Sequence, residues 1–294
     1  MSSIFITGTS GFVGSNLKGF LDASYIISEF NREKELNFNA NAVIHLAGKA
    51  HDLKNTSTPY EYYQVNTELT KKVFDAFLAS EAQLFITLSS VKAVADELEG
   101  TLTEEHFPIP ITHYGKSKLL AEQYILSKEI PKGKRVYILR PCMIHGPGNK
   151  GNLNLLYKLV SKNIPWPLGA FENQRSFCSI DNLMFVVREL IEREDIPSGV
   201  YNVADDESLS TNELIGLIAQ SQNRNSAILK IAKGVIEGVA SFGDKLHLPL
   251  NSERLHKLTS SYVVSNAKIK AAIGKPLPVS SKEGLLKTFE SFNS

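Results

Sequence analysis

The chain has 294 residues and is nearly neutral, with 32 lysines and arginines against 31 aspartates and glutamates. This length allows one large domain or two modest ones, and the charge balance argues against a nucleic-acid or membrane surface. Its two cysteines, Cys142 and Cys178, form neither a disulfide framework nor a C-x-x-C metal pattern. The chain opens directly into an apolar stretch, and no apolar run approaches the roughly 20 residues of a membrane span. We therefore expect a cytoplasmic protein without a signal peptide or a metal.

The first motif, IFITGTSGFVG at residues 4–14, predicts a β-strand, a tight turn and the start of a helix. In this pattern the first glycine permits the turn, the second lets a pyrophosphate approach, and the third lets helix and strand pack closely. The open helix N-terminus favours an anion. The alternative is a structural turn without a ligand. The expected dinucleotide contacts are Gly8, Ser10, Gly11, Phe12, Val13 and Gly14.

The residue after the second strand, which we expect at residues 25–27, bears on the choice of cofactor. An acid there holds the ribose 2′-hydroxyl of NAD(H), whereas a basic residue accommodates the 2′-phosphate of NADP(H). Counting from the glycine turn places Asn31 and Arg32 at this position, with Glu29 as the nearest acid. The sequence therefore favours NADP(H), with NAD(H) as the alternative. Arg32 is otherwise a solvated loop charge.

The next strand, residues 42–47, follows a segment that is short for a further helix–strand unit. Small residues at its end allow a cofactor ribose to lie close, so we expect contacts from Leu46, Ala47 and Gly48. His45 lies within the strand, and we expect a structural role for it.

A helix over residues 60–80 and a strand over residues 84–88 continue the alternation of elements. Asn66 interrupts the apolar face of the helix, and the strand runs into Ser89 and Ser90. This alternation predicts a Rossmann-type α/β fold, in which a parallel sheet has helices on both faces.

Tyr114 and Lys118 are four residues apart in YGKSKLLAE, on one face of an expected helix. A nearby ammonium favours the tyrosinate and would lower the pKa of the phenol, which makes Tyr114 a candidate acid/base. A hydroxyl from Ser89 or Ser90 would bind the same substrate oxygen. The alternative is a chance pair on a surface helix, because Y-x-x-x-K alone is common.

A further strand, residues 136–139, leads into Pro141 and the HGPG loop. The carboxyl edge of a parallel sheet is where ligands bind, so we expect Pro141 to border the cofactor. His145 touches nicotinamide or substrate, or is an ordinary loop histidine; the sequence does not decide between them.

The character of the chain changes after residue 150. We expect a dinucleotide-binding domain over residues 1–150, with returning elements at about 176–204. A smaller mixed substrate-binding region would comprise residues 151–175 and 205–294.

Together these motifs resemble the extended short-chain dehydrogenases/reductases that act on nucleotide sugars. The matching pieces are TGTSGFVG (7–14), HLAG (45–48), SS (89–90), YGKSK (114–118), RPCMIHGPG (140–148), NQRSFCSIDNL (173–183) and YNVADDESLSTNEL (201–214). Some phrases, such as SSVKA and PLG…NQRS, resemble a narrower group: bacterial UDP-glucose 4-epimerase-like enzymes that include reductases of UDP-4-keto-6-deoxy-N-acetylhexosamines.

The resemblance implies roles for particular residues. Tyr114 would be the acid/base, Lys118 would bind the nicotinamide ribose, and Ser90, in preference to Ser89, would bind the sugar oxygen. Asn152, Arg175 and Arg254 would bind the sugar nucleotide, with Arg175 on the diphosphate. The alternative for both arginines is a structural ion pair. Family helices equivalent to residues 60–80 and 114–128 pair between subunits, so a homodimer is expected.

The resemblance also has departures. Val91 stands where many members have a third hydroxyl residue, and Val91-Lys92 replaces the Asp-Glu pair of dehydratases. The second departure argues against a dehydratase, and the resemblance to the narrower group implies reduction at C4 of a UDP-4-keto sugar for polysaccharide synthesis. The alternatives are a UDP-sugar 4-epimerase with tightly bound NAD and a non-catalytic NADP-binding regulator or scaffold.

Overall fold

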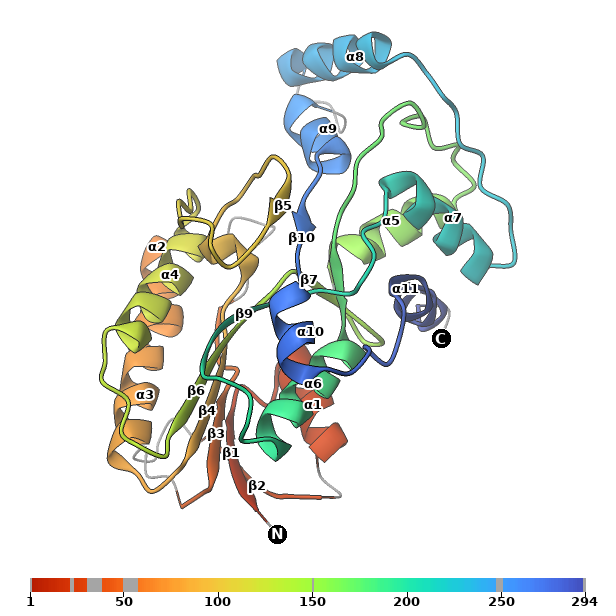
Figure 1. The fold of residues 1–294 in the computed structure, drawn as a ribbon. Helices are drawn as coiled ribbons and strands as arrows, with labels where there is room; N and C mark the ends of the chain where they lie inside the picture. The colour runs from red at the N-terminus through yellow and green to blue at the C-terminus, as the bar shows by residue number, and fades with distance from the viewer. Residues whose placement is uncertain are drawn as a thin grey trace.

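A parallel sheet organises the N-terminal part of the molecule (Figure 1). The computed structural model describes residues 2–21, 24–30, 39–49, 58–149, 151–246 and 251–292. Within these residues the main sheet has six strands, which run β1 (Ser3–Thr7), β2 (Ile26–Glu29), β3 (Ala42–His45), β4 (Leu84–Leu88), β6 (Arg135–Pro141) and β9 (Gly199–Val203). Most of these strands read as continuous apolar runs because both faces of the sheet are covered.

The strand order β2-β1-β3-β4-β6-β9 determines where a ligand would bind. From β1 the chain moves outward to β2 and then returns to place β3 on the other side of β1. The direction of winding therefore reverses between β1 and β3. In open parallel sheets this switch point opens a crevice at the carboxyl ends of the strands.

Helices cover both faces of the sheet, as the sequence predicts (Figure 1). On one face α1 (Phe12–Leu21), α6 (Ile180–Glu192) and α10 (Ala267–Ile273) enclose an apolar core with β1 and β3. On the other face α3 (Leu69–Ala79) and α4 (His113–Leu126) pack over β3, β4 and β6. The Rossmann-type α/β prediction is confirmed.

The helix expected over residues 60–80 is divided in the structure. It begins as α2 (Pro59–Tyr62), continues as a π-helical segment (Tyr63–Glu68) and becomes α3 only at Leu69. Asn66 and Thr67 lie inside the π-helical segment with buried side chains that bond outside the helix. Such widened turns occur frequently at functional sites.

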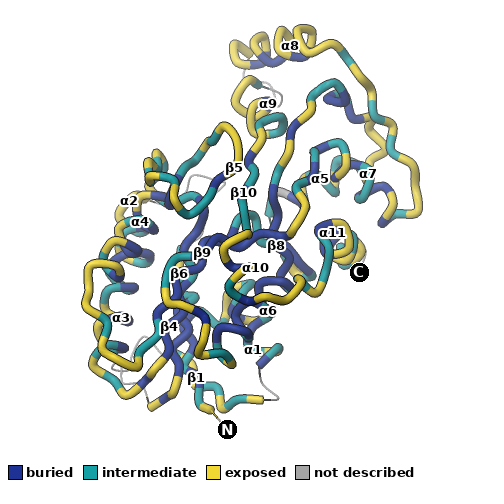
Figure 2. The backbone as a smooth tube through the Cα atoms, in the orientation of Figure 1, coloured by how far each residue is buried: buried dark blue, intermediate teal, exposed yellow. Residues whose placement is uncertain are grey.

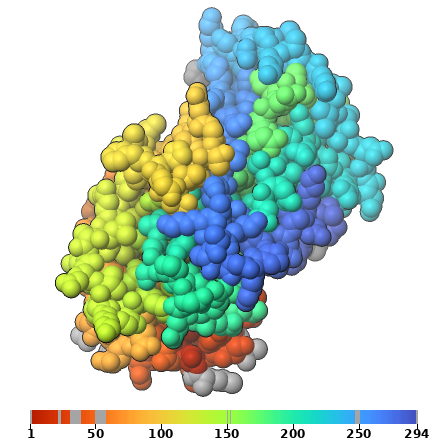
Figure 3. Space-filling model, viewed as in Figure 1, coloured from red at the N-terminus to blue at the C-terminus, as the bar shows by residue number. Residues whose placement is uncertain are grey.

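The remaining helices and two small strand pairs form a second part, whose α8 and α9 project beyond the rest of the molecule (Figures 1 and 3). Capping boxes at Ser210–Glu213 and Ser280–Glu283 define where two of its helices begin. Its helices are α5 (Asn152–Ser161), α7 (Thr211–Ser221), α8 (Lys233–Leu246), α9 (Ser252–Thr259) and α11 (Ser281–Glu290). The strand pairs are β5 (Thr101–Leu102) with β10 (Val263–Val264), and β7 (Met143–His145) with β8 (Phe177–Ser179). Figure 2 shows the sheet as the most buried layer and an exposed outer side on α8.

Candidate functional site

The glycine turn packs directly against the end of β3, at the switch point of the sheet. Gly8 has a φ of +77°, and a Cβ there would lie 2.6 Å from the backbone nitrogen of Ala47. A Cβ on Gly14 would lie 2.1 Å from the carbonyl oxygen of Gly8. Neither position tolerates a side chain, so these two glycines bring β1, α1 and β3 together.

The rim of this turn fits the pyrophosphate of a dinucleotide. Ser10 and Gly11 are exposed, and a Cβ on Gly11 would meet only the Gly8 oxygen, at 3.4 Å. Backbone N–H groups at the start of α1 are therefore accessible to an anion. Phe12 and Val13 are half-buried in the first turn of α1. Across the crevice lie Leu46 and Ala47, both half-buried, and the exposed Gly48.

Glu29 is the acid that the structure places beside the glycine turn. It ends β2, and its carboxylate accepts hydrogen bonds from Lys18 Nζ at 2.7 Å and Thr9 Oγ1 at 2.5 Å. Both bonds lower the pKa of Glu29, the one from Lys18 more than the one from Thr9, and keep its carboxylate ionised. Asn31 and Arg32 lie outside the described residues.

Tyr114 lies in the first turn of α4, and side chains fix where this helix begins. The Thr112 hydroxyl caps α4 by accepting from Gly115 N at 3.1 Å, and Asp96 accepts from Thr112 N at 3.0 Å. Tyr114 itself forms a hydrogen bond with Ser90, and the Tyr62 ring lies edge-on at 6.2 Å. The structure thus brings the Ser90 and Tyr114 hydroxyls together.

The pKa of Tyr114 departs from the prediction. Burial raises it above the ordinary 10.0, and the hydrogen bond with Ser90 lowers it by less. The lowering that we expected from Lys118 does not occur, because Lys118 is not among the groups that act on this phenol. In this structure the phenol is therefore neutral at physiological pH.

Lys118 lies one helical turn further along α4 and faces the end of β3. Its ammonium donates to the carbonyl oxygen of Leu88 at 2.9 Å, and burial lowers its pKa from 10.5 to about 8. A Cβ on Gly48 would lie 3.0 Å from Lys118 Nζ. Lys118 is thus within reach of a ribose at the end of β3. Ser89 Oγ is buried and has no partner among the described residues.

Asn66 positions the loop that follows β3. Its Oδ1 accepts from Lys49 N at 2.7 Å, and its Nδ2 donates to Lys49 O at 3.1 Å and Ser117 Oγ at 3.0 Å. The π-helical turn therefore connects this loop to α4 beside Lys118. This arrangement accounts for the polar residue that interrupts the apolar face in the sequence.

His45 has the structural place that the sequence predicts. It is buried between Thr7 Oγ1 at 2.7 Å and Thr70 Oγ1 at 2.9 Å. Because the Thr70 hydroxyl donates to Asn66 O, it accepts from Nε2–H of His45, and Nδ1 accepts from Thr7. Burial, followed by the charge of Lys118, lowers the pKa of His45 to about 3.

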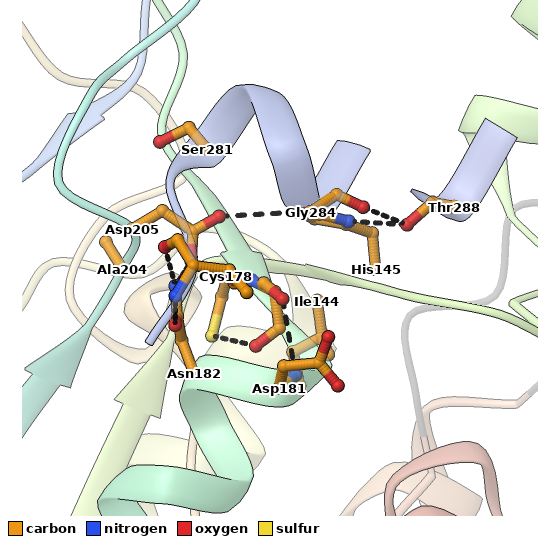
Figure 4. Close-up of polar contacts among 12 residues, drawn as sticks. Ile144, His145, Cys178, Asp181, Asn182, Ala204, Asp205, Ser281, Gly284 and Thr288 are labelled. Atoms are coloured by element: carbon orange, nitrogen blue, oxygen red, sulfur yellow. Dashed lines mark hydrogen bonds and ion pairs between the residues drawn. The ribbon is translucent and has the colours of Figure 1, made fainter. Parts of the chain in front are cut away.

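His145 also lies in a buried polar network, which Figure 4 shows. Its Nδ1 lies 2.9 Å from Thr288 Oγ1 on α11, and its Nε2 lies 3.4 Å from Asp205 Oδ2. Asp205 also accepts from Ser179 N and from Asn182 on α6. His145 is fully buried, so the described contacts favour the structural alternative over contact with a ligand.

The residues expected to bind substrate are spread over the second part. Arg175 pairs through its backbone with Leu209 and Tyr262, and its Nη2 donates to Ser260 Oγ at 3.3 Å. Arg254 is exposed on α9. Asn152 begins α5, and its side chain lies outside the described set. Pro141 is buried where β6 ends beside β9.

The sequence model of the NAD dependent epimerase/dehydratase family matches residues 26–204. The chain belongs to this family. As a member of the epimerase/dehydratase family it is an NAD(P)-dependent enzyme, which agrees with the resemblance drawn from its motifs.

Several relatives of this epimerase/dehydratase are known. It is 29% identical to the UDP-glucose 4-epimerase of Vibrio cholerae over 99% of this chain and 95% of the relative. It is 27% identical to a GDP-6-deoxy-D-mannose reductase of Pseudomonas aeruginosa, over 74% of this chain and 79% of the relative. Its fold matches that of UDP-glucuronic acid 4-epimerase from Bacillus cereus in complex with NAD, with a TM-score of 0.74 and 20% identity over 99% and 98% of the two chains.

Among the described residues of this epimerase/dehydratase, no group of three or more His, Cys, Asp or Glu side chains gathers as a metal ligand set. No helix among those residues is both long and apolar enough to cross a bilayer.

Two residues next to the site were not predicted as binding residues. Lys92 follows Ser90 in a 3₁₀ turn (Val91–Ala93), and Tyr262 comes from the other part of the chain. The phrase SSVKA offered a signal for Lys92, but we interpreted it as a resemblance to the narrower group and as the absence of a dehydratase pair, not as a binding residue. Nothing in the local sequence marks Tyr262, because its contacts lie far away in the chain.

Proposed function

We propose that this enzyme reduces the C4 carbonyl of a UDP-4-keto-6-deoxy-N-acetylhexosamine, a precursor of bacterial polysaccharide. The observation that carries the proposal is the Ser90–Tyr114 hydroxyl pair beside Lys118, at the same sheet edge as the glycine turn. Two hydroxyls that converge on one point suit a carbonyl oxygen, because both can donate to it as negative charge develops. Arg175 supports a diphosphate-bearing substrate.

In this reaction each side chain of the site has a separate role. When bound, the nicotinamide supplies or accepts the hydride at C4. Ser90 and Tyr114 polarise the C4 oxygen, and the neutral Tyr114 phenol donates its proton to that oxygen. Lys118 orients the cofactor ribose near Tyr114, and Asn66 connects Lys49, just after β3, to Ser117 beside Lys118.

The neutral phenol of Tyr114 suits the proton-donating step of a reduction. Epimerisation uses the same hydroxyl first as a base and then as an acid, so the two reactions are separated by whether the cofactor is consumed.

A UDP-sugar 4-epimerase is the second candidate, and the relatives support it. The Vibrio cholerae relative aligns over 99% of this chain and is a UDP-glucose 4-epimerase. An epimerase uses the same residues but retains NAD, because the hydride taken from C4 returns to the same sugar.

The described residues support NAD(H) as the cofactor. The Glu29 carboxylate lies at the glycine turn, where an acid accepts a bond from the 2′-hydroxyl and repels a 2′-phosphate. This proposal differs from the sequence-based preference for NADP(H), which depended on Arg32.

One experiment separates the two reactions. Purified enzyme is incubated with UDP-sugars and UDP-4-keto sugars, with and without NADH or NADPH, and the products are identified by NMR. A reductase consumes the added cofactor one-for-one with the keto sugar. Tight NAD after purification, together with interconversion of UDP-sugars without added cofactor, would establish the epimerase instead.

The Tyr114→Phe variant tests the mechanism under either reaction. Its ring retains the packing of Tyr114 but has no proton to donate, so we expect turnover to be lost and NADH affinity to stay within about threefold. Tyr124→Phe, on the same helix but bonded to Asp75, is the matched control and should retain activity. Full activity in Tyr114→Phe would exclude the proposed mechanism.

A further inference from the structure

Lys92 lies in the 3₁₀ turn that follows Ser90. Its backbone N donates to Ser90 Oγ at 3.2 Å. Its carbonyl oxygen lies against Gly115, where an added Cβ would be only 2.3 Å from it. Lys92 is therefore fixed between Ser90 and the residue that follows Tyr114.

The ammonium group of Lys92 is held on an aromatic ring from the other part of the chain. Its Nζ lies 4.4 Å from the centroid of the Tyr262 ring and donates to Asp96 O at 2.5 Å. The Tyr262 hydroxyl donates to Ala95 O at 2.7 Å, which fixes this ring against the Ser90 turn. Cation–π contact leaves the remaining ammonium donors of Lys92 available, since an aromatic face accepts no ordinary hydrogen bond.

The backbone of Tyr262 also pairs with that of Arg175, so the segment that contacts Lys92 holds Arg175 as well. Tyr262 N donates to Gln174 O at 2.8 Å, and Ser176 N donates to Tyr262 O at 3.0 Å, so the two segments pair on either side of Arg175. The buried Nε of Arg175 has no partner among the described residues. A guanidinium has five donors, and the contacts above use only the one to Ser260.

Two partly buried cations side by side are costly unless an anion lies near both. Burial lowers the pKa of Lys92, and Arg175 lowers it further, while Asp96 and Glu97 act in the opposite direction. The Asp96 carboxylate also accepts hydrogen bonds from Ile111 N and Thr112 N. An anion near both cations would meet the unpartnered Nε of Arg175 as well as the ammonium of Lys92.

We propose that Lys92 is a second cationic ligand of the substrate's diphosphate, next to Arg175. This inference rests on the proposed function, which puts the sugar C4 at Ser90 and Tyr114 and the diphosphate at Arg175. Lys92 is bonded to Ser90 through its backbone, and its ammonium lies on the Tyr262 ring, in the segment that pairs with Arg175. A diphosphate at Arg175 would therefore lie close to the Lys92 ammonium.

The test measures the binding of UDP and, separately, of NADH to the wild type and to Lys92→Met. We expect UDP to bind about tenfold more weakly or worse to the variant, because a charge-assisted hydrogen bond is lost. NADH should bind within about twofold of the wild type, since its pyrophosphate lies at the glycine turn. Lys92→Arg keeps the charge and should recover most of the UDP affinity.

Lys134→Met is the matched control. Lys134 is likewise held by carbonyls, those of Phe77, Ser80 and Ala82, and lies 4.5 Å from the centroid of an aromatic ring, Phe77. It follows α4 at the opposite end of the sheet, so its loss should leave both affinities unchanged.

The outcomes separate this inference from the proposed function. If the wild type binds UDP and Arg175→Met weakens it but Lys92→Met does not, the role of Lys92 is refuted and the function stands. If the wild type does not bind UDP, both are refuted. Should Lys92→Met fail to fold, Lys92→Gln replaces it, and the salt dependence of UDP binding must become shallower for the role to stand.

Discussion

Tyr114 combines a neutral phenol with a position beside Ser90, and this predicts a direction for the pH profile. Because burial raises the pKa of Tyr114 above 10.0, its proton is present throughout the neutral range. With both ligands saturating, the single-turnover rate of NADH oxidation should not rise between about pH 6 and about pH 9, a range in which Lys118, with a pKa of about 8, loses its charge. Stopped-flow absorbance measures it. A reductive rate that rises with pH would mean that the ionised residue is the active form.

A conservative substitution of Glu29 tests the proposal that the enzyme binds NAD(H). Glu29→Gln keeps the size of the side chain but removes the charge that would repel a 2′-phosphate. We expect the ratio of NADPH to NADH affinity to rise about tenfold, as measured by nicotinamide fluorescence. Glu192→Gln, a change near Tyr25 on another surface, should leave the ratio as it is. A wild type that already prefers NADPH would refute the NAD(H) proposal.

The backbone of α1 packs closely against the glycine turn at Gly14. Comparing Gly14 with Gly19, a glycine of the same helix that has open space around it, tests this close contact. Gly14→Ala puts a Cβ 2.1 Å from Gly8 O, so we expect about 2 kcal/mol of lost stability and weaker NADH binding. Gly19→Ala meets no atom within 4 Å and should stabilise the protein by up to about 1 kcal/mol. Urea unfolding with and without NADH measures both. Equal effects of the two substitutions would contradict this account of the turn.

The elements that the sequence predicts best are those whose signal is local. Apolar runs indicate the strands, and the spacing of three glycines indicates the turn before α1. The π-helical segment was missed because Asn66 bonds to Lys49 and Ser117, which periodicity within one helix does not reveal. The β5–β10 pair was missed because its strands are two residues long and lie some 160 positions apart.

The candidate site divides in the same way. Tyr114, Lys118 and Ser90 follow from short motifs, and the structure brings Tyr114 and Ser90 into contact. The raised pKa of Tyr114 was not predictable, because it depends on how deeply α4 is buried. Tyr262 reaches Lys92 from a separate part of the chain, so its position depends on tertiary packing.

The molecule as a whole should lose stability in acid because of one residue. His45 has a pKa of about 3 when folded against an ordinary 6.5, so unfolding takes up a proton below pH 6.5. Its contribution is complete above pH 6.5 and declines as the pH falls toward 3. Between pH 7 and pH 5 this costs about 2 kcal/mol of unfolding free energy.

Urea unfolding at both pH values, compared with His45→Gln, measures this contribution. The variant is less stable at pH 7, but its stability should change less with pH. His256→Gln, at an exposed position, should keep the pH dependence of the wild type. The interpretation fails if His45→Gln and the wild type lose the same free energy between the two pH values.

After residue 150 the chain enters the second part of the molecule, and with α6 and β9 it returns to the main sheet. We propose that residues 1–150 with 176–204 form the dinucleotide-binding unit and that the rest binds the sugar nucleotide. The network of His145, Asp205 and Thr288 joins the returning segment to α11 (Figure 4). The predicted homodimer remains to be tested, and light scattering of the purified protein would decide it.

The late position of β9 affects how the protein is made. Synthesis proceeds from the N-terminus, so β6 has an open edge until residues 199–203 have left the ribosome. An unpaired apolar edge invites association with other chains, and α6, which covers this core, also arrives late. A nascent chain that stops near residue 150 would therefore be a client for chaperones or an aggregate, not a small cofactor-binding protein.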